Sequence, residues 1–228
     1  MIDYYLKLTV AILPFLWQGF KETFIVSLVA IFAGSLLGLI IGVIRSYNIV
    51  LLAKLLGLYV HSLRGTPFLV QLYLFYFVLP NTGVAWLSWD SQTAAFVALS
   101  LYTSSYVAEI VRGSIAAVPK GQWEAATAVG MNQMQCLWHI ILPQALKLTI
   151  APMSSVYVII IKSTAILSVV GIAELTRQGE VTILRYPRDI LFIYSLIAAV
   201  YFIYCYPILW FSRWTEGRIT NTPRLSLD

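Results

Sequence analysis

Three ionisable side chains interrupt long apolar runs of the sequence: Arg64, Glu109 and Lys162. If these runs cross a membrane, a charge at the bilayer centre costs about 2.5–3.5 kcal/mol, so each side chain should face protein or water and have a partner. An arginine or a lysine held part-way across a membrane can bind a carboxylate. We therefore predict that Arg64 or Lys162 receives the carboxylate of a solute on a path through the chain.

Uncharged polar side chains close to these charges could line the same path. The candidates are Gln71, Thr103, Ser104, Ser105 and Tyr106. Arg64 is followed by Gly65-Thr66-Pro67, and a helix break of this kind is where transporters often contact their substrates. The predicted path is therefore formed by Arg64, Gln71, Thr103, Ser104, Glu109 and Lys162, with Ser105 and Tyr106 beside them.

A structural role is the alternative for the same charges. Glu109 lies near the end of its apolar run, and Arg112 follows it by three residues, so an ion pair between them would hold the helices together. Lys162 could pair with a side chain of another helix in the same way. Both interpretations, substrate contact and ion pair, remain open at this point.

Motifs for catalysis and metal binding are missing from the sequence. There is no G-x-x-x-x-G-K-[ST] phosphate loop and no G-x-S-x-G turn. His61 and His139 lie apart, with no Cys or carboxylate at ligand spacing, so we predict no metal site. Cys136 and Cys205 fall in different kinds of segment, which argues against a disulfide framework. We expect no catalytic residue, and any ATP must be bound by another polypeptide.

The composition indicates the elements that would hold these residues. Hydrophobic residues make up 60% of the 228 residues and charged residues 11%, whereas a soluble domain has about 25% charged residues. The net charge of +5 comes from basic residues scattered singly, so we expect no nucleic-acid partner. The sequence predicts an all-α polytopic bundle in lipid, one domain over residues 1–228. The first residues lack the basic start and cleavage site of a signal peptide, so we take them as part of the mature protein.

Five apolar runs are candidate membrane spans. The predicted spans are Thr23–Ile44, Leu51–Pro80, Thr93–Ile110, Leu148–Gly171 and Ile190–Phe211. The second is too long for one straight crossing, so Leu51–Leu63 would lead into it and Phe68–Leu79 would complete it. Leu8–Phe20 is short and interrupted by Pro14, and we expect it to lie along the membrane surface. Gly34, Gly38 and Gly42 recur every four residues, a pattern typical of close helix packing.

The distribution of basic residues predicts the orientation. With the N-terminus outside and the C-terminus inside, eight basic residues are cytoplasmic and five external, with Arg64 and Lys162 left in the spans. The cytoplasmic set is Arg45, Lys54, Arg112, Lys120, Lys147, Arg213, Arg218 and Arg224, and the external set is Lys7, Lys21, Arg177, Arg185 and Arg188.

Residues 112–147 form the longest segment without a predicted span and read as two short helices. The first would start at an N-cap on Gly121 and end at a left-handed Gly130. Asn132, with Gln135 three residues later, would cap the second, and Pro143 would end or kink it. Its apolar stripe is Met134, Leu137, Trp138 and Ile141. Such a pair could dock another protein or rest on lipid, and local physics does not separate the two interpretations.

The spacing of residues in this loop does separate them. Glu124-Ala125-Ala126, Gly130 and Ile140-Ile141-Leu142-Pro143 follow the pattern E-A-A, three residues, G, nine residues, I-x-L-P. This resembles the cytoplasmic loop of importer permeases of the ATP-binding-cassette (ABC) class. Further segments look like the polar-amino-acid permeases of that class: Arg64-Gly65-Thr66-Pro67 with Val70-Gln71-Leu72, then 108–113, Leu142-Pro143-Gln144-Ala145 and Lys162-Ser163-Thr164.

The resemblance implies a type I ABC importer permease in the bacterial cytoplasmic (inner) membrane. It implies ATPase subunits that use ATP and Mg, a second permease chain (identical or different), an extracytoplasmic solute-binding protein and a polar amino acid as substrate. Glu124, Ala125, Ala126, Gly130 and Pro143 would then form the ATPase-docking segment of the coupling loop 112–147. Lys162-Ser163-Thr164-Ala165 departs from the commoner Lys-Asp-Thr-Ser, so the sequence does not say which amino acid is carried.

Two other functions are alternatives for a polytopic membrane chain. A self-contained secondary transporter or channel would need no partner, but no inverted repeat is visible. A non-transporting membrane scaffold would leave the charges inside the spans without a purpose.

Overall fold

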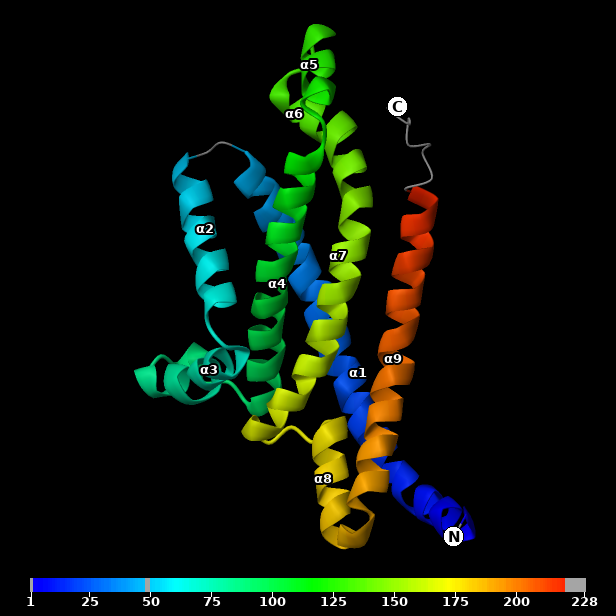
Figure 1. Ribbon diagram of the computed structural model, residues 1–228. Helices are drawn as coiled ribbons and strands as arrows, with labels where there is room; N and C mark the ends of the chain where they lie inside the picture. The colour runs from blue at the N-terminus through cyan, green and yellow to red at the C-terminus, as the bar shows by residue number, and fades with distance from the viewer. Residues whose placement is uncertain (1, 48–49, 220–228) are drawn as a thin grey trace.

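The computed structural model describes residues 2–47 and 50–219, and this part of the chain is helical with no strand. The long helices run side by side, with shorter ones at the two ends (Figure 1). The α-helices are α1 Ile2–Ser46, α2 Val50–Gly65, α3 Phe68–Tyr73, α4 Ser91–Ala117, α5 Lys120–Ala128, α6 Gln133–Cys136, α7 Leu142–Ser163, α8 Leu175–Arg185 and α9 Ile190–Ile219. Tighter or wider turns connect them: η1 Leu74–Val78, η2 Leu79–Thr82, η3 Ala85–Leu87, η4 Leu137–Ile141, η5 Thr164–Val170 and η6 Pro187–Asp189.

The spans agree with the prediction of about five crossings. Among the described residues, four helical segments are long and apolar enough to cross a membrane: Ile2–Ser46, Ser91–Ala117, Gln133–Val170 and Pro187–Thr215. The bent pair Leu51–Gly65 and Phe68–Thr82 makes a fifth if it is counted as one span. The N-terminal end of α1 lies at one end of the bundle, and α5 and the end of α9 lie at the other (Figure 1). This arrangement is the one expected for N-out/C-in; Arg224 of the predicted cytoplasmic set lies outside the described residues.

Leu8–Phe20 is not a separate segment, because helix α1 contains both it and the predicted span Thr23–Ile44. This helix has 45 residues and continues through Pro14. Leu8, Ile12 and Leu16 are 5%, 1% and 4% exposed and pack against α8 and α9. Membrane helices tolerate proline where neighbouring helices support them, and α8 and α9 support α1 around Pro14. That Leu8–Phe20 lies along the membrane surface stays a prediction.

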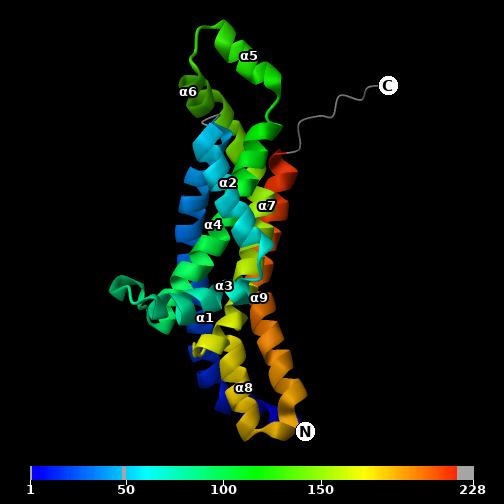
Figure 2. The same cartoon turned by 90° about the vertical axis from the view of Figure 1, so that its left-hand side faces the viewer.

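The predicted second span is sharply bent between its two parts, Leu51–Leu63 and Phe68–Leu79. The chain turns by 107° between α2 and the segment that begins with α3. Figure 2 shows this segment projecting sideways from the bundle instead of continuing along α2. Pro67 has no backbone N–H and an extended conformation (φ −61°, ψ 137°), so the helix cannot continue through it. Gln71 stabilises the bend, because its Nε2 donates to the Leu63 carbonyl (2.6 Å) and the Thr66 carbonyl (3.0 Å) of the preceding turn.

The glycines of α1 form the contact with α4, which is the most extensive contact between any two helices of the described chain. A Cβ on Gly34, Gly38 or Gly42 would lie 2.5–2.7 Å from atoms of α4, including Thr103, Val107 and the Ala108 carbonyl. Only glycine permits so close an approach, and the predicted packing face of α1 is confirmed.

The end opposite α5 contains a helix that the sequence did not predict, α8. Gly171, at φ +87°, ends η5, and α8 begins after the N-cap Glu174. The Glu174 carboxylate is fully buried and accepts hydrogen bonds from the backbone N–H of Thr176 (2.8 Å) and Arg177 (2.7 Å) and from the Tyr201 hydroxyl (3.2 Å). Burial raises the pKa of Glu174, and these hydrogen bonds oppose the shift. Glu174 thus ties α8 to α9.

Candidate functional site

Helix α5 projects beyond the end of the bundle between α4 and α6, in the middle of the predicted coupling loop (Figures 1 and 2). It starts at Lys120 after the N-cap Pro119, so the predicted N-cap at Gly121 is wrong by two residues. Pro119 is extended and Val118 ends α4, which leaves a short connection there. The predicted loop 112–147 is correspondingly shorter, because α4 continues to Ala117 and α7 begins at Leu142.

The end of α5 confirms the predicted left-handed Gly130. Its φ is +87°, its N–H donates to the Thr127 carbonyl (3.0 Å), and the Met131 N–H donates to the Ala126 carbonyl (3.1 Å). These two bonds form a Schellman motif, which satisfies carbonyl groups at the helix end. The motif fixes the direction in which the chain leaves α5 for α6.

The predicted docking residues of α5 do not share one environment. Glu124 and Ala125 are exposed, as a contact with a partner requires. Ala126 is 5% exposed and packs with Val118 and Leu137 of its own chain, so the structure gives it a packing role instead. Val129, 76% exposed at the end of α5, is an additional candidate that sequence reasoning missed. An apolar residue directly before the helix-ending glycine was the available signal.

The second loop helix starts as predicted but does not end at Pro143. The Asn132 N–H donates to Gln135 Oε1 (3.0 Å) and the Gln135 N–H donates to Asn132 Oδ1 (2.9 Å), a complete capping box. From there the helix runs through the wide turn η4 into α7, with Pro143 in the first turn of α7. The wide turn η4 lies directly before Pro143, and a local change of turn width of this kind lets a membrane helix continue through a residue that has no N–H. Pro143 is therefore part of the fourth span and does not stop the helix.

The predicted apolar stripe of this helix is divided between two environments. Leu137 and Ile141 are buried, whereas Met134 and Trp138 are 53% and 52% exposed. The i→i+5 turn η4 changes the helical period, so residues expected on one face separate. Met134 Sδ accepts hydrogen bonds from the Tyr47 hydroxyl (2.9 Å) and from Trp138 Nε1 (3.0 Å), which joins α6 to the end of α1.

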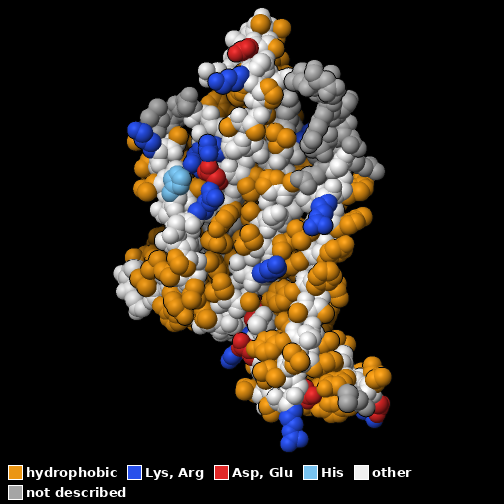
Figure 3. Space-filling view, viewed as in Figure 1, with side chains coloured by type: hydrophobic (Ala, Val, Ile, Leu, Met, Phe, Trp, Pro, Cys, Tyr) orange, Lys and Arg blue, Asp and Glu red, His pale blue; other side chains and the backbone are white. Residues whose placement is uncertain are grey.

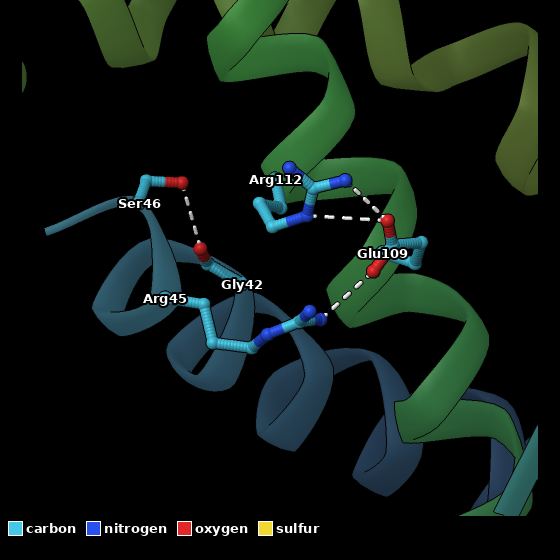
Figure 4. Close-up of polar contacts among 5 residues, drawn as sticks. All are labelled: Gly42, Arg45, Ser46, Glu109 and Arg112. Carbon is cyan, nitrogen blue, oxygen red and sulfur yellow. Dashed lines mark hydrogen bonds and ion pairs between the residues drawn. The ribbon is translucent and has the colours of Figure 1, made fainter. Parts of the chain in front are cut away.

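Glu109 forms ion pairs with two arginines, as the structural interpretation of the charges inside the spans predicted. Its Oε2 accepts a hydrogen bond from Arg45 Nη1 of α1 (2.8 Å), and its Oε1 accepts from Arg112 Nε (3.1 Å) and Nη2 (Figure 4). The expected Arg112 partner is present. The sequence did not predict the second partner, Arg45, because the glycine repeat does not say which helix covers it. Helices α1 and α4 run parallel with Gly42 against Val111, and the Arg45 side chain, one turn after Gly42, reaches back to Glu109.

Arg64 and Lys162 have no carboxylate partner among the described residues. The Arg64 guanidinium carbon lies 5.2 Å from the centre of the Tyr106 ring, and the Tyr106 hydroxyl is 3.1 Å from that of Tyr102. Lys162 is exposed near the end of α7, and neither an ion pair nor a hydrogen bond holds it within this part of the chain. The predicted pairing of Lys162 across helices is therefore not formed within the described chain.

The uncharged polar candidates are mostly engaged in helix packing. Gln71, Thr103, Ser104 and Ser105 are 0–3% exposed. Gln71 bonds across the α2–α3 bend, Thr103 donates to the Leu99 carbonyl (2.7 Å), Ser104 pairs with the Tyr59 hydroxyl (2.6 Å), and Ser105 donates to the Tyr102 carbonyl (2.7 Å). In the described chain these four side chains are packed between helices. Of the predicted lining residues, Tyr106 is the one that contacts Arg64.

Among the described residues, no three His, Cys, Asp or Glu side chains form a group that could hold a metal ion. Cys136 and Cys205 are both buried as free thiols. The chemistry available in the described chain is therefore that of its in-span charges and of the exposed face of α5.

Comparison with known protein families places this arrangement among transport proteins. Residues 34–221 match the family described as binding-protein-dependent transport system inner membrane component. The chain is 34% identical over 199 residues to the probable amino-acid ABC transporter permease protein YckA of Bacillus subtilis (strain 168), covering 87% of this chain and 86% of that protein. It is 36% identical to the L-cystine transport system permease protein TcyB of the same organism, over 85% and 81% of the two chains.

Two further comparisons agree. The glutamine transport system permease protein GlnP of Escherichia coli (strain K12) is 33% identical, covering 91% of this chain and 94% of that protein. The crystal structure of an amino acid ABC transporter with histidines superposes with a TM-score of 0.83 at 33% identity, over 92% of this chain and 96% of that one.

Proposed function

The chain belongs to the family of binding-protein-dependent transport system inner membrane components, and we propose that it is the permease subunit of an ATP-driven ABC importer of polar amino acids. The observation that carries the proposal is the free-standing helix α5, with Glu124 and Ala125 exposed beyond the end of a membrane bundle that has no phosphate loop of its own.

We infer that the exposed face of α5 docks into a groove of the ATPase subunit. Ala125 and Ala128 present small side chains, Glu124 a charge and Val129 an apolar contact at the end of the helix. Small side chains let a partner approach the helix closely, and Ala126 anchors the opposite face to the chain's own core. Gly130 and Pro143 act indirectly in this proposal: the first fixes where α5 ends, and the second lies at the start of α7.

Coupling follows from the connections of α5. It is joined through Val118 and Pro119 to α4 and through Gly130 and α6 to α7, so a displacement of α5 moves two spans together. A ligand shifts a conformational equilibrium only by binding two states differently. Nucleotide-driven closure of the ATPase pair would supply this difference, and the spans would open alternately to each side. ATP and Mg are used by the ATPase; this chain contributes no catalytic group.

We propose that Arg64 or Lys162 receives the substrate carboxylate. Each is a cation in a spanning segment without an acidic partner in the described chain. An unpaired cation is costly in lipid, and a side chain that faces a water-filled path avoids this cost. The path would be completed by a second permease chain, and an extracytoplasmic solute-binding protein would deliver the amino acid. The assembly would lie in the bacterial inner membrane.

Substitution of an exposed alanine tests the docking proposal. Ala125→Arg adds a long charged side chain to the face of α5, and we expect it to abolish co-purification of the ATPase subunit and ATP-dependent uptake in vesicles. Ala85→Arg is the matched control, since Ala85 is also exposed but lies in η3, far from α5 along the chain. Undiminished ATPase binding by Ala125→Arg would exclude α5 as the docking element.

A further inference from the structure

A pocket rich in cations lies where α1, α4 and α5 meet. This basic pocket has a volume of about 340 Å³ and is lined by Arg45 and Ser46 at the end of α1, Arg112 and Ile115 of α4, and Lys120 and Trp123 of α5. The lining residues come from a span end on one side and from the projecting helix on the other. The pocket is therefore at the boundary between the membrane bundle and the solvent-exposed loop.

The charges around the basic pocket do not balance. Arg45, Arg112 and Lys120 carry three positive charges, and Glu109 is the one carboxylate within ion-pair distance of any of them in the described chain. Both Glu109 oxygens are already occupied by the two arginines (Figure 4). Glu124, one turn after Lys120, forms no ion pair with it. An excess of two positive charges is left, and Figure 3 shows Lys and Arg side chains around an acidic one toward the α5 end of the molecule.

The arginines are held in position for a ligand. Arg45 and Arg112 are fixed by their bonds to Glu109, and the Arg45 side chain is only 9% exposed. Arginine guanidinium groups match phosphate oxygens, often with two hydrogen bonds at once, and a nearby lysine adds a point charge. Trp123 and Ile115 give the pocket an apolar border that a glycerol or acyl segment could contact.

We propose that the basic pocket binds the phosphate of an anionic phospholipid of the inner leaflet, for example phosphatidylglycerol. Basic pockets between helices on the cytoplasmic side of a membrane protein bind such headgroups. The inference rests on the proposed function for one point, that the α5 end faces the cytoplasm. A bound headgroup would join α1, α4 and α5 and would brace the docking helix against the bundle.

The binding test uses purified, delipidated permease and measures the phosphatidylglycerol retained by native mass spectrometry. Lys120 is exposed and outside the Glu109 cluster, so Lys120→Gln should fold normally. We expect it to weaken phosphatidylglycerol binding about fivefold, which corresponds to ~1 kcal/mol per cation near an anionic surface. Lys120→Arg should retain binding. Lys147→Gln is the matched control, an exposed lysine of α7 outside the pocket, and should bind like the unmodified chain.

The other outcomes overturn the proposal. Equal retention of phosphatidylglycerol and phosphatidylcholine, or equal losses for Lys120→Gln and Lys147→Gln, would exclude a lipid phosphate site. Binding of inorganic phosphate alone, with no retention of phosphatidylglycerol, would mean that the basic pocket binds a free anion and not a lipid headgroup. Loss of ATPase co-purification in Lys120→Gln with unchanged lipid binding would assign the pocket to the ATPase. Lipid binding is measured without the ATPase, so an absence of lipid binding would leave the result of the docking experiment on Ala125 unchanged.

Discussion

At the scale of single residues, the charges in the spans divide into two kinds. Glu109 is held by Arg45 and Arg112, so its role is to join α1 to α4. Arg64 and Lys162 have no acidic partner in the described chain, and Arg64 instead lies over the Tyr106 ring. An ion pair within the chain lowers the cost of charge in a membrane, whereas an unpaired cation requires water, a ligand or another chain.

The unpaired lysine gives the first prediction. Lys162→Ala should reduce amino-acid uptake at least tenfold, because it removes one of the two cations that we propose for the substrate carboxylate. ATPase co-purification should be unchanged. Lys147→Ala, near the other end of the same helix, is the control and should transport normally. Normal uptake by Lys162→Ala would remove this residue from the path.

The ion-paired Glu109 gives the second prediction. Glu109→Gln leaves the nearly buried Arg45 without its carboxylate, and we expect a loss of about 2 kcal/mol in the free energy of unfolding. Thermal unfolding in detergent should then start ~5 °C lower. Glu180→Gln removes a carboxylate from an exposed pair with Arg177 and should change the midpoint little. Equal shifts in the two variants would contradict the assigned role of Glu109.

At the scale of elements, two segments differ from a simple alternation of spans and loops. The α2–α3 bend turns the chain by 107° beside Arg64, and the Gln71 amide holds it by bonding to the end of α2. Helix α6 continues into α7 through a wide turn, so the second half of the coupling loop belongs to a span. Within the predicted loop 112–147, α5 is therefore the helix that stands apart from the spans.

The end of α5 is testable through Gly130. Gly130→Ala forces a side chain into the left-handed region at φ +87° and should cost about 1–2 kcal/mol locally. Hydrogen exchange of the α5 amides should accelerate, and coupling of ATP hydrolysis to uptake should weaken. Gly121→Ala, inside the same helix with open space around its Cα, is the control and should slow exchange in α5. Unchanged protection in Gly130→Ala would show that the Schellman motif does not hold α5 in place.

At the scale of the whole molecule, the contact between α1 and α4 organises the bundle. The glycines of α1 lie on Thr103, Val107 and Val111 of α4, with the Arg45–Glu109 pair at the end of the same interface. Helix α4 is joined to α5 through Val118 and Pro119, so in the proposed coupling a rigid contact with α1 would limit how far a displacement of α5 is transmitted. The N-terminal part of α1 reaches α8 and α9 at the other end of the molecule.

Alanine substitutions of two helical glycines test this interface. In Gly38→Ala, the new Cβ would lie 2.6 Å from the Val107 Cβ and 2.7 Å from the Ser104 carbonyl oxygen, so the helices must separate. We expect a lower unfolding midpoint and reduced yield of folded permease. Gly113→Ala, in α4 with nothing within 4 Å, should be neutral or stabilising by up to ~1 kcal/mol. The contact would be unimportant if the two variants unfolded at the same temperature.

The features that the sequence determined by itself are local or periodic. Apolar runs identified the spans, the four-residue glycine repeat identified the packing face of α1, and side-chain rules identified the Asn132–Gln135 cap and the left-handed Gly130. The spacing of Glu124, Ala125, Ala126 and Gly130 indicated the family. These features depend on residues within a few helical turns, so they can be recognised without knowing where other helices lie.

Only the tertiary structure decided what depends on neighbours distant in sequence. The continuation of α1 through Pro14 depends on contacts with α8 and α9, and the partner Arg45 of Glu109 comes from another helix. Burial of Ala126, and of Gln71, Thr103, Ser104 and Ser105, separated packing residues from exposed candidates of the same chemical type. A helix has several faces of similar composition, and the free energy of burying one of them depends on which helix covers it.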